Sequence, residues 1–255
     1  MKAFAALAVA ALLGCATAPP APDTRRSGFD FMAPETQAMQ RDDKANPGML
    51  WVQDGEQLWN KHPGAQGKAC VACHAAASSS MRGVAARYPA WDTALARPVN
   101  LATRINLCRQ RHQQLPELRP EHQELLALEA YVAHQSRGLP IAPDPDPRLT
   151  PFRERGAALF NRRIGQLDLS CAQCHDQLAG GKLAGSVIPQ GHATGYPLYR
   201  LEWQALGSLQ RRLRGCMTGV RAEPFAANGV EMAELELHLA ARAMGLPLET
   251  PAVRP

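Results

Sequence analysis

Two segments of the sequence, Cys70–His74 and Cys171–His175, share the pattern C-x-x-C-H. This pattern is the attachment signature of c-type haem, in which two thiols bond to the haem vinyl groups and the following histidine binds the iron. Two C-x-x-C knuckles could instead hold zinc, and such pairs also occur as redox dithiols. Neither alternative explains a histidine after both second cysteines, so we predict two covalently bound haem c groups. The attachment residues are Cys70, Cys73, Cys171 and Cys174, and the histidine ligands are His74 and His175.

Two further cysteines occupy equivalent places and are the predicted second ligands of the two irons. Cys108 and Cys216 are offset by 108 residues, and each follows a haem motif. No methionine lies between Met81 and Met217, so the first half lacks the usual methionine ligand. Because methionine ligation raises the reduction potential of haem iron, thiolate ligation at both irons implies low potentials.

Other ligand assignments remain open at this point. Met217 directly follows Cys216 and is a rival ligand for the second iron. The two odd cysteines could also form a Cys108–Cys216 disulfide. Three histidines are candidates for the first iron, although loop or surface positions suit them equally: His112, His122 and His134.

The surroundings of the two odd cysteines differ. Arg104 and Arg212 each stand four residues before a cysteine, one helical turn away, and could hold a haem propionate or face solvent. Beyond that repeat, segment 211–221 surrounds Cys216 with two glycines and four arginines, whereas Cys108 has aliphatic neighbours. Arginine lowers a thiol pKa and binds anions. We therefore predict that Cys216 is a reactive thiol suited to a small sulfur oxyanion.

An internal repeat positions these residues. Gly55–Asn60 and Gly156–Asn161 match at an offset of 101, and each begins 15 residues before a haem motif. Leu125–Pro140 and Met232–Pro247 match at an offset of 107, and each has apolar residues at helical spacing before a Gly-Leu-Pro end. This is the element order of a small cytochrome c domain. The predicted fold is mainly α, with two tandem cytochrome c-like domains related by internal duplication and preceded by an N-terminal extension.

The N-terminus indicates export. The apolar run from Ala3 to Leu13 is shorter than the roughly 20 residues that span a bilayer, but it suits a signal peptide. Leu12–Cys15 resembles a bacterial lipoprotein cleavage box, so a lipid anchor at Cys15 and plain secretion both remain open, and we expect a periplasmic protein without a transmembrane span. The expected boundaries are 1–15 signal peptide, 16–49 tether and arm lying on the first domain, 50–141 first haem domain, 142–150 Pro-rich linker, and 151–255 second, active-site haem domain.

The composition excludes several classes of protein. Hydrophobic residues make up 45% of the 255 residues and charged residues 20%, which is ordinary for a folded chain and excludes collagen, coiled coils and wholesale disorder. The net charge is +5, with 23 arginines and five lysines. Because the arginines are scattered and no aromatic residues interleave them, nucleic acid is not an expected partner.

Several segments outside the haem motifs resemble the SoxA family of dihaem cytochromes. The resemblance extends over nearly all of the chain after the signal segment. Some members of that family have lost the first haem, whereas this chain keeps its motif and Cys108. The segments that carry the resemblance are 26–32, 46–51, 83–89, 104–109, 130–138 and the loop around Cys216.

The resemblance implies an L-cysteine S-thiosulfotransferase. In that activity, thiosulfate is joined oxidatively to a cysteine of a SoxYZ-like carrier, and the electrons pass to a SoxX-like monohaem cytochrome. The family's active cysteine, a haem ligand found as a persulfide, maps onto Cys216, and its substrate-binding arginine maps onto Arg212. A plain dihaem electron-transfer protein is the alternative, and it predicts methionine ligation or an inert Cys216. By the same resemblance, the iron ligands are His74 and Cys108 for the first haem and His175 and Cys216 for the second.

Overall fold

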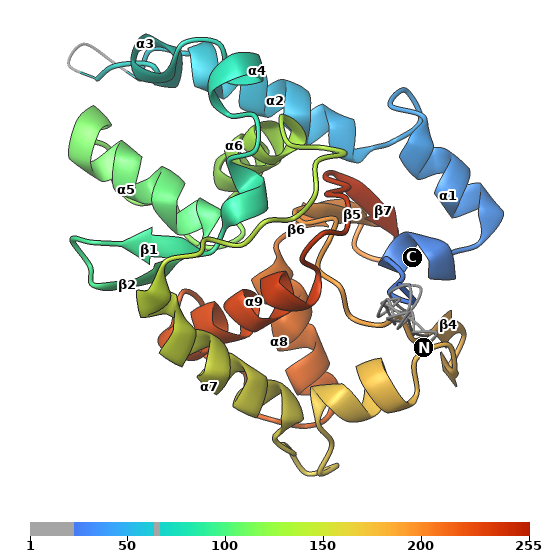
Figure 1. Cartoon of the computed structure of the whole chain (residues 1–255). Helices are drawn as coiled ribbons and strands as arrows, with labels where there is room; N and C mark the ends of the chain where they lie inside the picture. Colours follow the sequence, from blue (N-terminus) through green and yellow to red (C-terminus); the bar gives the residue numbers. More distant parts are fainter. Residues whose placement is uncertain (1–22, 64–66) are drawn as a thin grey trace, which may run out of the picture.

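The chain forms two helical halves that share one order of elements (Figure 1). The computed structural model describes residues 23–63 and 67–255, so the predicted signal peptide and Cys15 lie outside the described residues. The first half contains α2 (Gly48–Asn60), α3 (Cys70–His74), α4 (Ala77–Ser80), β1 (Ala90–Asp92), β2 (Arg97–Val99), α5 (Leu101–Gln113) and α6 (Gln123–His134). The second contains α7 (Thr150–Asn161), a π-helical turn (Gln173–Gln177), β3 (Lys182–Leu183), β4 (Ser186–Val187), β5 (Leu198–Arg200), β6 (Ala205–Gly207), α8 (Leu209–Gly219), α9 (Val230–Arg242) and β7 (Ala252–Arg254).

In both halves the first and last helices cross at a glycine. A β-carbon on Gly55 of α2 would collide with the carbonyl oxygen of Ala127 on α6, and one on Gly156 of α7 would collide with that of Glu234 on α9. Glycine is therefore required at both positions, because only a residue without a side chain permits so close a backbone approach. The matching crossings support the internal duplication that the sequence predicts.

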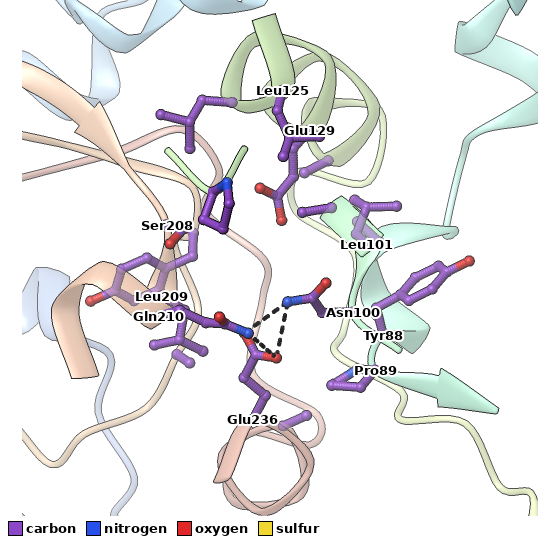
Figure 2. A pocket seen from close by; sticks show the side chains of 18 of the residues that line it. Tyr88, Pro89, Asn100, Leu101, Leu125, Glu129, Ser208, Leu209, Gln210 and Glu236 are labelled. Atoms are coloured by element: carbon purple, nitrogen blue, oxygen red, sulfur yellow. Dashed lines mark hydrogen bonds between the residues drawn. The ribbon is translucent and has the colours of Figure 1, made fainter. Parts of the chain in front are cut away.

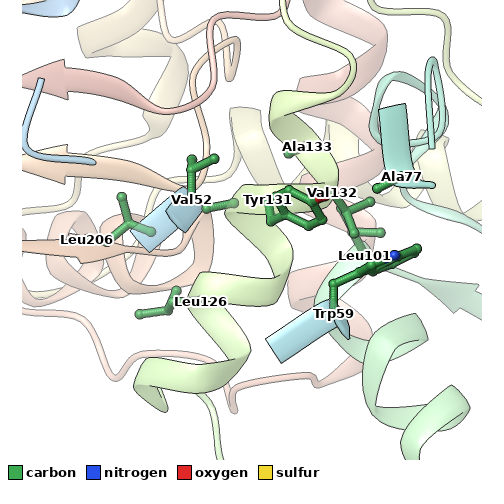
Figure 3. Packing of buried hydrophobic residues seen from close by; sticks show 10 residues of the cluster. Val52, Trp59, Ala77, Leu101, Leu126, Tyr131, Val132, Ala133 and Leu206 are labelled. Atoms are coloured by element: carbon green, nitrogen blue, oxygen red, sulfur yellow. The ribbon is translucent and has the colours of Figure 1, made fainter. Parts of the chain in front are cut away.

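Each half has its own hydrophobic core, and the first core extends across the boundary. Figure 3 shows Trp59 of α2 and Tyr131 of α6 in the first core, where their ring centroids lie 5.9 Å apart. Leu206 of β6, in the second half, is 1% exposed and packs in the same core. The second core is built around Phe160 and Met232. Because a strand of the second half contributes to the first core, the two halves are packed together rather than merely tethered.

The equivalent Gly-Leu-Pro ends of α6 and α9 also join the halves. Segments 138–141 and 245–248 run antiparallel and exchange four backbone hydrogen bonds of 2.8–2.9 Å, two from each segment. The arrangement is close to two-fold symmetric, since Gly138 donates to Leu248 and Gly245 donates to Ile141. None of the helices in the described part of the chain is long and apolar enough to cross a membrane.

The small sheets differ between the halves. In the first half, β1 and β2 form an antiparallel hairpin. In the second, β5 lies between β6, with which it is antiparallel, and β7, with which it is parallel. The second half therefore has one additional strand beside the segment that leads into α8.

The N-terminal arm lies mainly on the second half, so the expectation that it lies on the first domain is wrong. The arm contains η1 (Gly28–Phe31) and α1 (Pro34–Arg41), and α1 lies beside β7 in Figure 1. Asn46 donates a side-chain hydrogen bond to the carbonyl of Pro251, and Arg25 donates to two carbonyls at the C-terminal end of α9. Polar residues of the arm supply these contacts, and hydrophobic periodicity does not reveal such partners.

Candidate active site

His175 and Cys216 face each other in the second half. The first lies in the π-helical turn Gln173–Gln177, and the second lies on α8. Their side chains are within hydrogen-bonding reach. Single π-helical turns are frequent at functional sites. The arrangement thus brings an imidazole and a thiol together, and both kinds of side chain can bind a metal.

A loop holds His175 in one orientation. The carbonyl of Pro189 lies 2.8 Å from Nδ1 of His175, which leaves Nε2 for a metal. A β-carbon on Gly191, whose φ is +72°, would lie 3.0–3.2 Å from the imidazole ring, so this loop packs directly against the ring. The loop belongs to a seven-residue insertion, since the offset between the halves rises from 101 at the haem motifs to 108 at the odd cysteines.

The electrostatic surroundings favour the thiolate of Cys216. Burial raises the pKa of this thiol, but the hydrogen bond from His175 and the charges of Arg212 and Arg200 outweigh burial, so the net pKa lies below its ordinary value. The pKa of His175 is raised: burial lowers it, but the hydrogen bond to Cys216 and the bond to Pro189 overcome that effect. A thiolate is both the nucleophilic and the metal-binding form of cysteine.

The four arginines of segment 211–221 do not form a ring around the thiol. Of these four, Arg212 is the one whose charge acts on Cys216. Arg211 stacks on Trp203 at 4.0 Å from the ring centroid, and Arg214 donates to the carbonyl of Phe225. Arg212 is offset from Cys216 by one helical turn, whereas Arg211 and Arg214 point from other faces of α8. Arg212 is therefore the arginine of this segment that acts on the thiol, while Arg211 and Arg214 are engaged with Trp203 and Phe225.

Arg200 is a further residue whose charge acts at this site, and the haem motifs and the segment around Cys216 do not reveal it. It lies at the end of β5, outside the segment around Cys216, and its charge helps to lower the pKa of that thiol. The signal was available, because the offset of 108 that relates Cys108 to Cys216 also places Arg200 at the equivalent of Asp92.

The equivalent thiol of the first half has the opposite electrostatics. Burial raises the pKa of Cys108 more than Arg104 and Arg111 lower it. Arg104, the counterpart of Arg212, forms a 2.7 Å ion pair with Asp92. Cys108 lies near the two cysteines of the first haem motif, and the histidine of that motif, His74, is exposed.

The rival ligands have different surroundings, and His112 is the one that shares a helix with a predicted cysteine ligand, one turn after Cys108 on α5. Met217 is 4% exposed and packs in the second hydrophobic core, away from the face of Cys216. His122 caps α6 by accepting from the backbone N–H of Glu124, and His112 is exposed in the last turn of α5. His134 ends α6, where burial lowers its pKa. All six described cysteines are free, so the Cys108–Cys216 disulfide is not formed.

A cavity lies between the halves, and Cys216 is not among the residues that line it. It has a volume of about 120 Å³, and Figure 2 shows Glu129 of α6 and Glu236 of α9 projecting into it. Glu236 accepts hydrogen bonds from Asn100 and Gln210, whereas Oε2 of Glu129 is buried without a partner. Burial, followed by the charges of other glutamates, raises the pKa of Glu129 to about 8.

The donor sets of both motifs fit covalent haem c. The six free cysteines leave every thiol available, and burial raises the pKa of Cys171 to about 11, as expected for a thiol enclosed in apolar surroundings. Within residues 23–63 and 67–255, no group of three or more His, Cys, Asp and Glu side chains converges as a metal site. The zinc alternative therefore has no support in this part of the chain.

Comparisons with known proteins agree with this geometry. A family model described as the SoxA/TsdA cytochrome c domain matches residues 54–141 and 155–248. L-cysteine S-thiosulfotransferase subunit SoxA of Pseudaminobacter salicylatoxidans is 39% identical over 91% of this chain and 82% of that protein. Its namesake in Rhodovulum sulfidophilum is 36% identical over 91% of this chain and 81% of that protein.

A solved structure supports the fold as well. The crystal structure of SoxXA from P. pantotrophus matches with a TM-score of 0.87 and 32% identity, covering 91% of this chain and 87% of that chain. The prediction of a mainly helical fold with two tandem cytochrome c-like domains is confirmed.

Proposed function

The chain belongs to the SoxA/TsdA cytochrome c family, and we propose that it is the SoxA subunit of an L-cysteine S-thiosulfotransferase. One observation carries this proposal: the thiol of Cys216 faces His175, and its pKa is lowered despite burial, with Arg212 one turn away. An electron-transfer haem requires no thiol of lowered pKa. Sulfur chemistry does, because the thiolate is the reactive form.

The proposed reaction joins thiosulfate to a cysteine of a SoxYZ-like carrier. A sulfur–sulfur bond forms between the sulfane sulfur of thiosulfate and the carrier sulfur, and the carrier thiol loses its proton. The products are a cysteine S-thiosulfonate, one proton and two electrons. The carrier sulfur and the sulfane sulfur are oxidised together, each by one electron, and a SoxX-like monohaem cytochrome in a heterodimer with this chain is the proposed route for the electrons.

Cytochrome c domains bind haem c, and we infer that this chain holds two. Cys70 and Cys73 would attach the first, and Cys171 and Cys174 the second. The iron ligands would be His74 with Cys108 and His175 with Cys216. The second haem would supply an electron acceptor next to the sulfur being oxidised.

The residues of the chain itself would carry and orient sulfur. Cys216 is the proposed carrier of the transferable sulfur, as a thiolate or a persulfide. Arg212 is the proposed binding residue for the sulfonate end of thiosulfate, since a guanidinium presents a planar fork of N–H donors to oxyanions. With the sulfonate held there, the sulfane sulfur would point toward Cys216. The Pro189 carbonyl would keep His175 in the orientation required for ligation.

The expected location is the periplasm, where haem c is attached and where the carrier would be found. The apolar segment before Cys15 supports export. Whether Cys15 carries a lipid depends on processing of the cleavage box, and mass analysis of the isolated protein distinguishes a lipidated Cys15 from a secreted chain.

The test is thiosulfate conjugation with the purified complex. The holoprotein with its monohaem partner is mixed with carrier and thiosulfate, and the carrier is weighed by intact-mass spectrometry. We expect one thiosulfate adduct per carrier cysteine together with reduction of haem. A complex that exchanges electrons normally but forms no adduct would instead be an electron-transfer protein.

A further inference from the structure

Arg200 occupies in the second half the place that Asp92 occupies in the first. The offset of 108 that relates the odd cysteines also relates strand β1 to β5 and strand β2 to β6. It relates the cis Tyr88–Pro89 bond to the cis Tyr196–Pro197 bond as well. Both residues therefore stand at the end of the equivalent strand, and the duplicated backbone carries opposite charges at this one position.

In the first half, this position neutralises the arginine that precedes the cysteine. Oδ2 of Asp92 lies 2.7 Å from Arg104 and 3.5 Å from Arg111. The Asp92 side chain is 3% exposed and also accepts from the backbone N–H of Leu95. The charge of Arg104 is therefore paired with a buried carboxylate of the protein itself.

In the second half, the same position adds a second positive charge. The duplication places Arg200 toward Arg212 as Asp92 lies toward Arg104, and the charge of Arg212 adds to burial in lowering the pKa of Arg200. The Arg200 side chain is 13% exposed, and its Nε is buried without a hydrogen-bond partner. No carboxylate among residues 23–63 and 67–255 pairs with Arg212.

One weak interaction offsets the charge of Arg200. Its Nη2 donates to Glu202 at 2.9 Å, but the Glu202 side chain is 65% exposed, and solvent screens such a pair strongly. The centroid of the Trp203 ring lies 5.2 Å from the guanidinium carbon of Arg200. A partly buried pair of like charges is costly, and an anion bound between the two arginines would relieve that cost.

We propose that Arg200 is a second anion-binding residue, which acts with Arg212 to hold the oxyanion end of thiosulfate beside Cys216. This assignment rests on the function proposed above. Thiosulfate is a dianion, so two guanidinium groups match its charge, and two forks offer more N–H donors than one to its sulfonate oxygens. A haem propionate is the other oxyanion with the required chemistry, and the experiment separates the two.

The experiment compares Arg200→Gln and Arg200→Lys with the wild-type holocomplex. Conjugation kinetics give KM for thiosulfate and kcat, calorimetric titration with thiosulfate in the absence of carrier gives Kd, and absorbance and EPR spectra report the second haem. Arg163→Gln is the matched control for the loss of one positive charge. The Arg163 side chain is 56% exposed, and this variant removes the same charge as Arg200→Gln. We expect Arg200→Gln to raise KM and Kd about ten- to a hundredfold with a wild-type haem spectrum, and Arg200→Lys to raise them less.

Two results would overturn the proposal. If Arg200→Gln has wild-type KM and Kd, the residue does not bind thiosulfate. If it shifts the spectrum or potential of the second haem with KM unchanged, the residue serves a haem propionate. Absence of conjugation by the wild-type complex would instead refute the proposed function, so the two failures are distinguishable. Should Arg200→Gln fold poorly, the Arg200→Lys comparison alone decides between these outcomes.

Discussion

The two halves of this protein carry a cysteine at the same place in the same fold, yet the two thiols differ in their electrostatics. Burial raises the pKa of Cys108, whereas His175, Arg212 and Arg200 lower the pKa of Cys216 below its ordinary value. The helix that bears the cysteine and the arginine one turn before it are common to both halves. The duplicated backbone thus sets the position of the thiol, while charges on neighbouring elements set its pKa.

The halves also differ in how the motif histidine is held. His175 is oriented by the Pro189 carbonyl and by the close approach of Gly191. His74 is exposed, and among its described contacts is the Trp59 ring, 5.7 Å away between centroids. The insertion after the second motif thus supplies a restraint that has no counterpart at His74 among the described residues of the first half.

The strongest test of the comparison removes each thiol in turn. Cys216→Ala should lower the rate of thiosulfate conjugation about a thousandfold or more, because it removes the proposed sulfur carrier. Cys108→Ala should change the EPR signal of the first haem and leave substantial turnover. Complete loss of activity in Cys108→Ala, with a normal second haem, would show that the roles of the two halves are misassigned.

A second test removes the arginines at equivalent positions. Arg212→Ala should lower kcat/KM for thiosulfate about ten- to a hundredfold, as loss of one charge-assisted contact requires, and Arg212→Lys should also be impaired. Arg104→Ala should instead lower stability, because it leaves the carboxylate of Asp92 buried with a weaker partner. Thermal unfolding of both variants, measured beside their kinetics, checks this division. Equal kinetic effects of Arg104→Ala and Arg212→Ala would contradict it.

The pH dependence of stability sharpens the comparison at the boundary between the halves. Burial raises the pKa of Glu129 to about 8 and that of Glu236 to about 7, so these two carboxyls bind more protons in the folded protein than in the unfolded chain above about pH 4.5. Their contribution to stability should therefore fall as pH rises from about 4.5 to 8. Glu129→Gln should stabilise the protein by about 1–3 kcal/mol at pH 8.5 and little at pH 5.

The corresponding substitution of the other cavity carboxylate should have a smaller effect on stability. Glu236→Gln should stabilise less than Glu129→Gln, because Glu236 already accepts hydrogen bonds from Asn100 and Gln210. Glu154→Gln, on the exposed face of α7, serves as the control for charge alone. Melting temperatures of the three variants at both pH values provide the measurement, and identical pH profiles for all three would exclude a role for the cavity carboxylates.

The smallest effect is expected at Met217. Its side chain packs in the second core rather than toward His175, so Met217→Leu should leave the low-spin spectrum of the second haem unchanged and cost less than about 1.5 kcal/mol of stability. Low-temperature EPR and thermal unfolding are the measurements. A new haem signal in this variant would identify Met217, not Cys216, as an iron ligand.

The sequence is sufficient for features that depend on local spacing. Intervals along the chain reveal the C-x-x-C-H motifs, the repeat and the equivalent places of Cys108 and Cys216. Covalent attachment and helix geometry constrain those intervals. The position of the arm does not follow, since single polar contacts such as Asn46 with Pro251 decide it. Arg200 could have been found only by carrying the alignment of the halves beyond the motifs and asking where the charge changes sign.

The pairing of β5 with β7 joins the second site to a segment far along the chain. β1 and β2 close as a hairpin between near neighbours, whereas the strand that ends in Arg200 must also find a parallel partner far along the chain. Contacts between distant segments require closure of a long loop before they contribute any stability, so they form late in folding. We therefore expect the β5–β7 pairing to form after the β1–β2 hairpin, and because Leu206 of β6 packs in the first core, that core is complete only when the second half is in place.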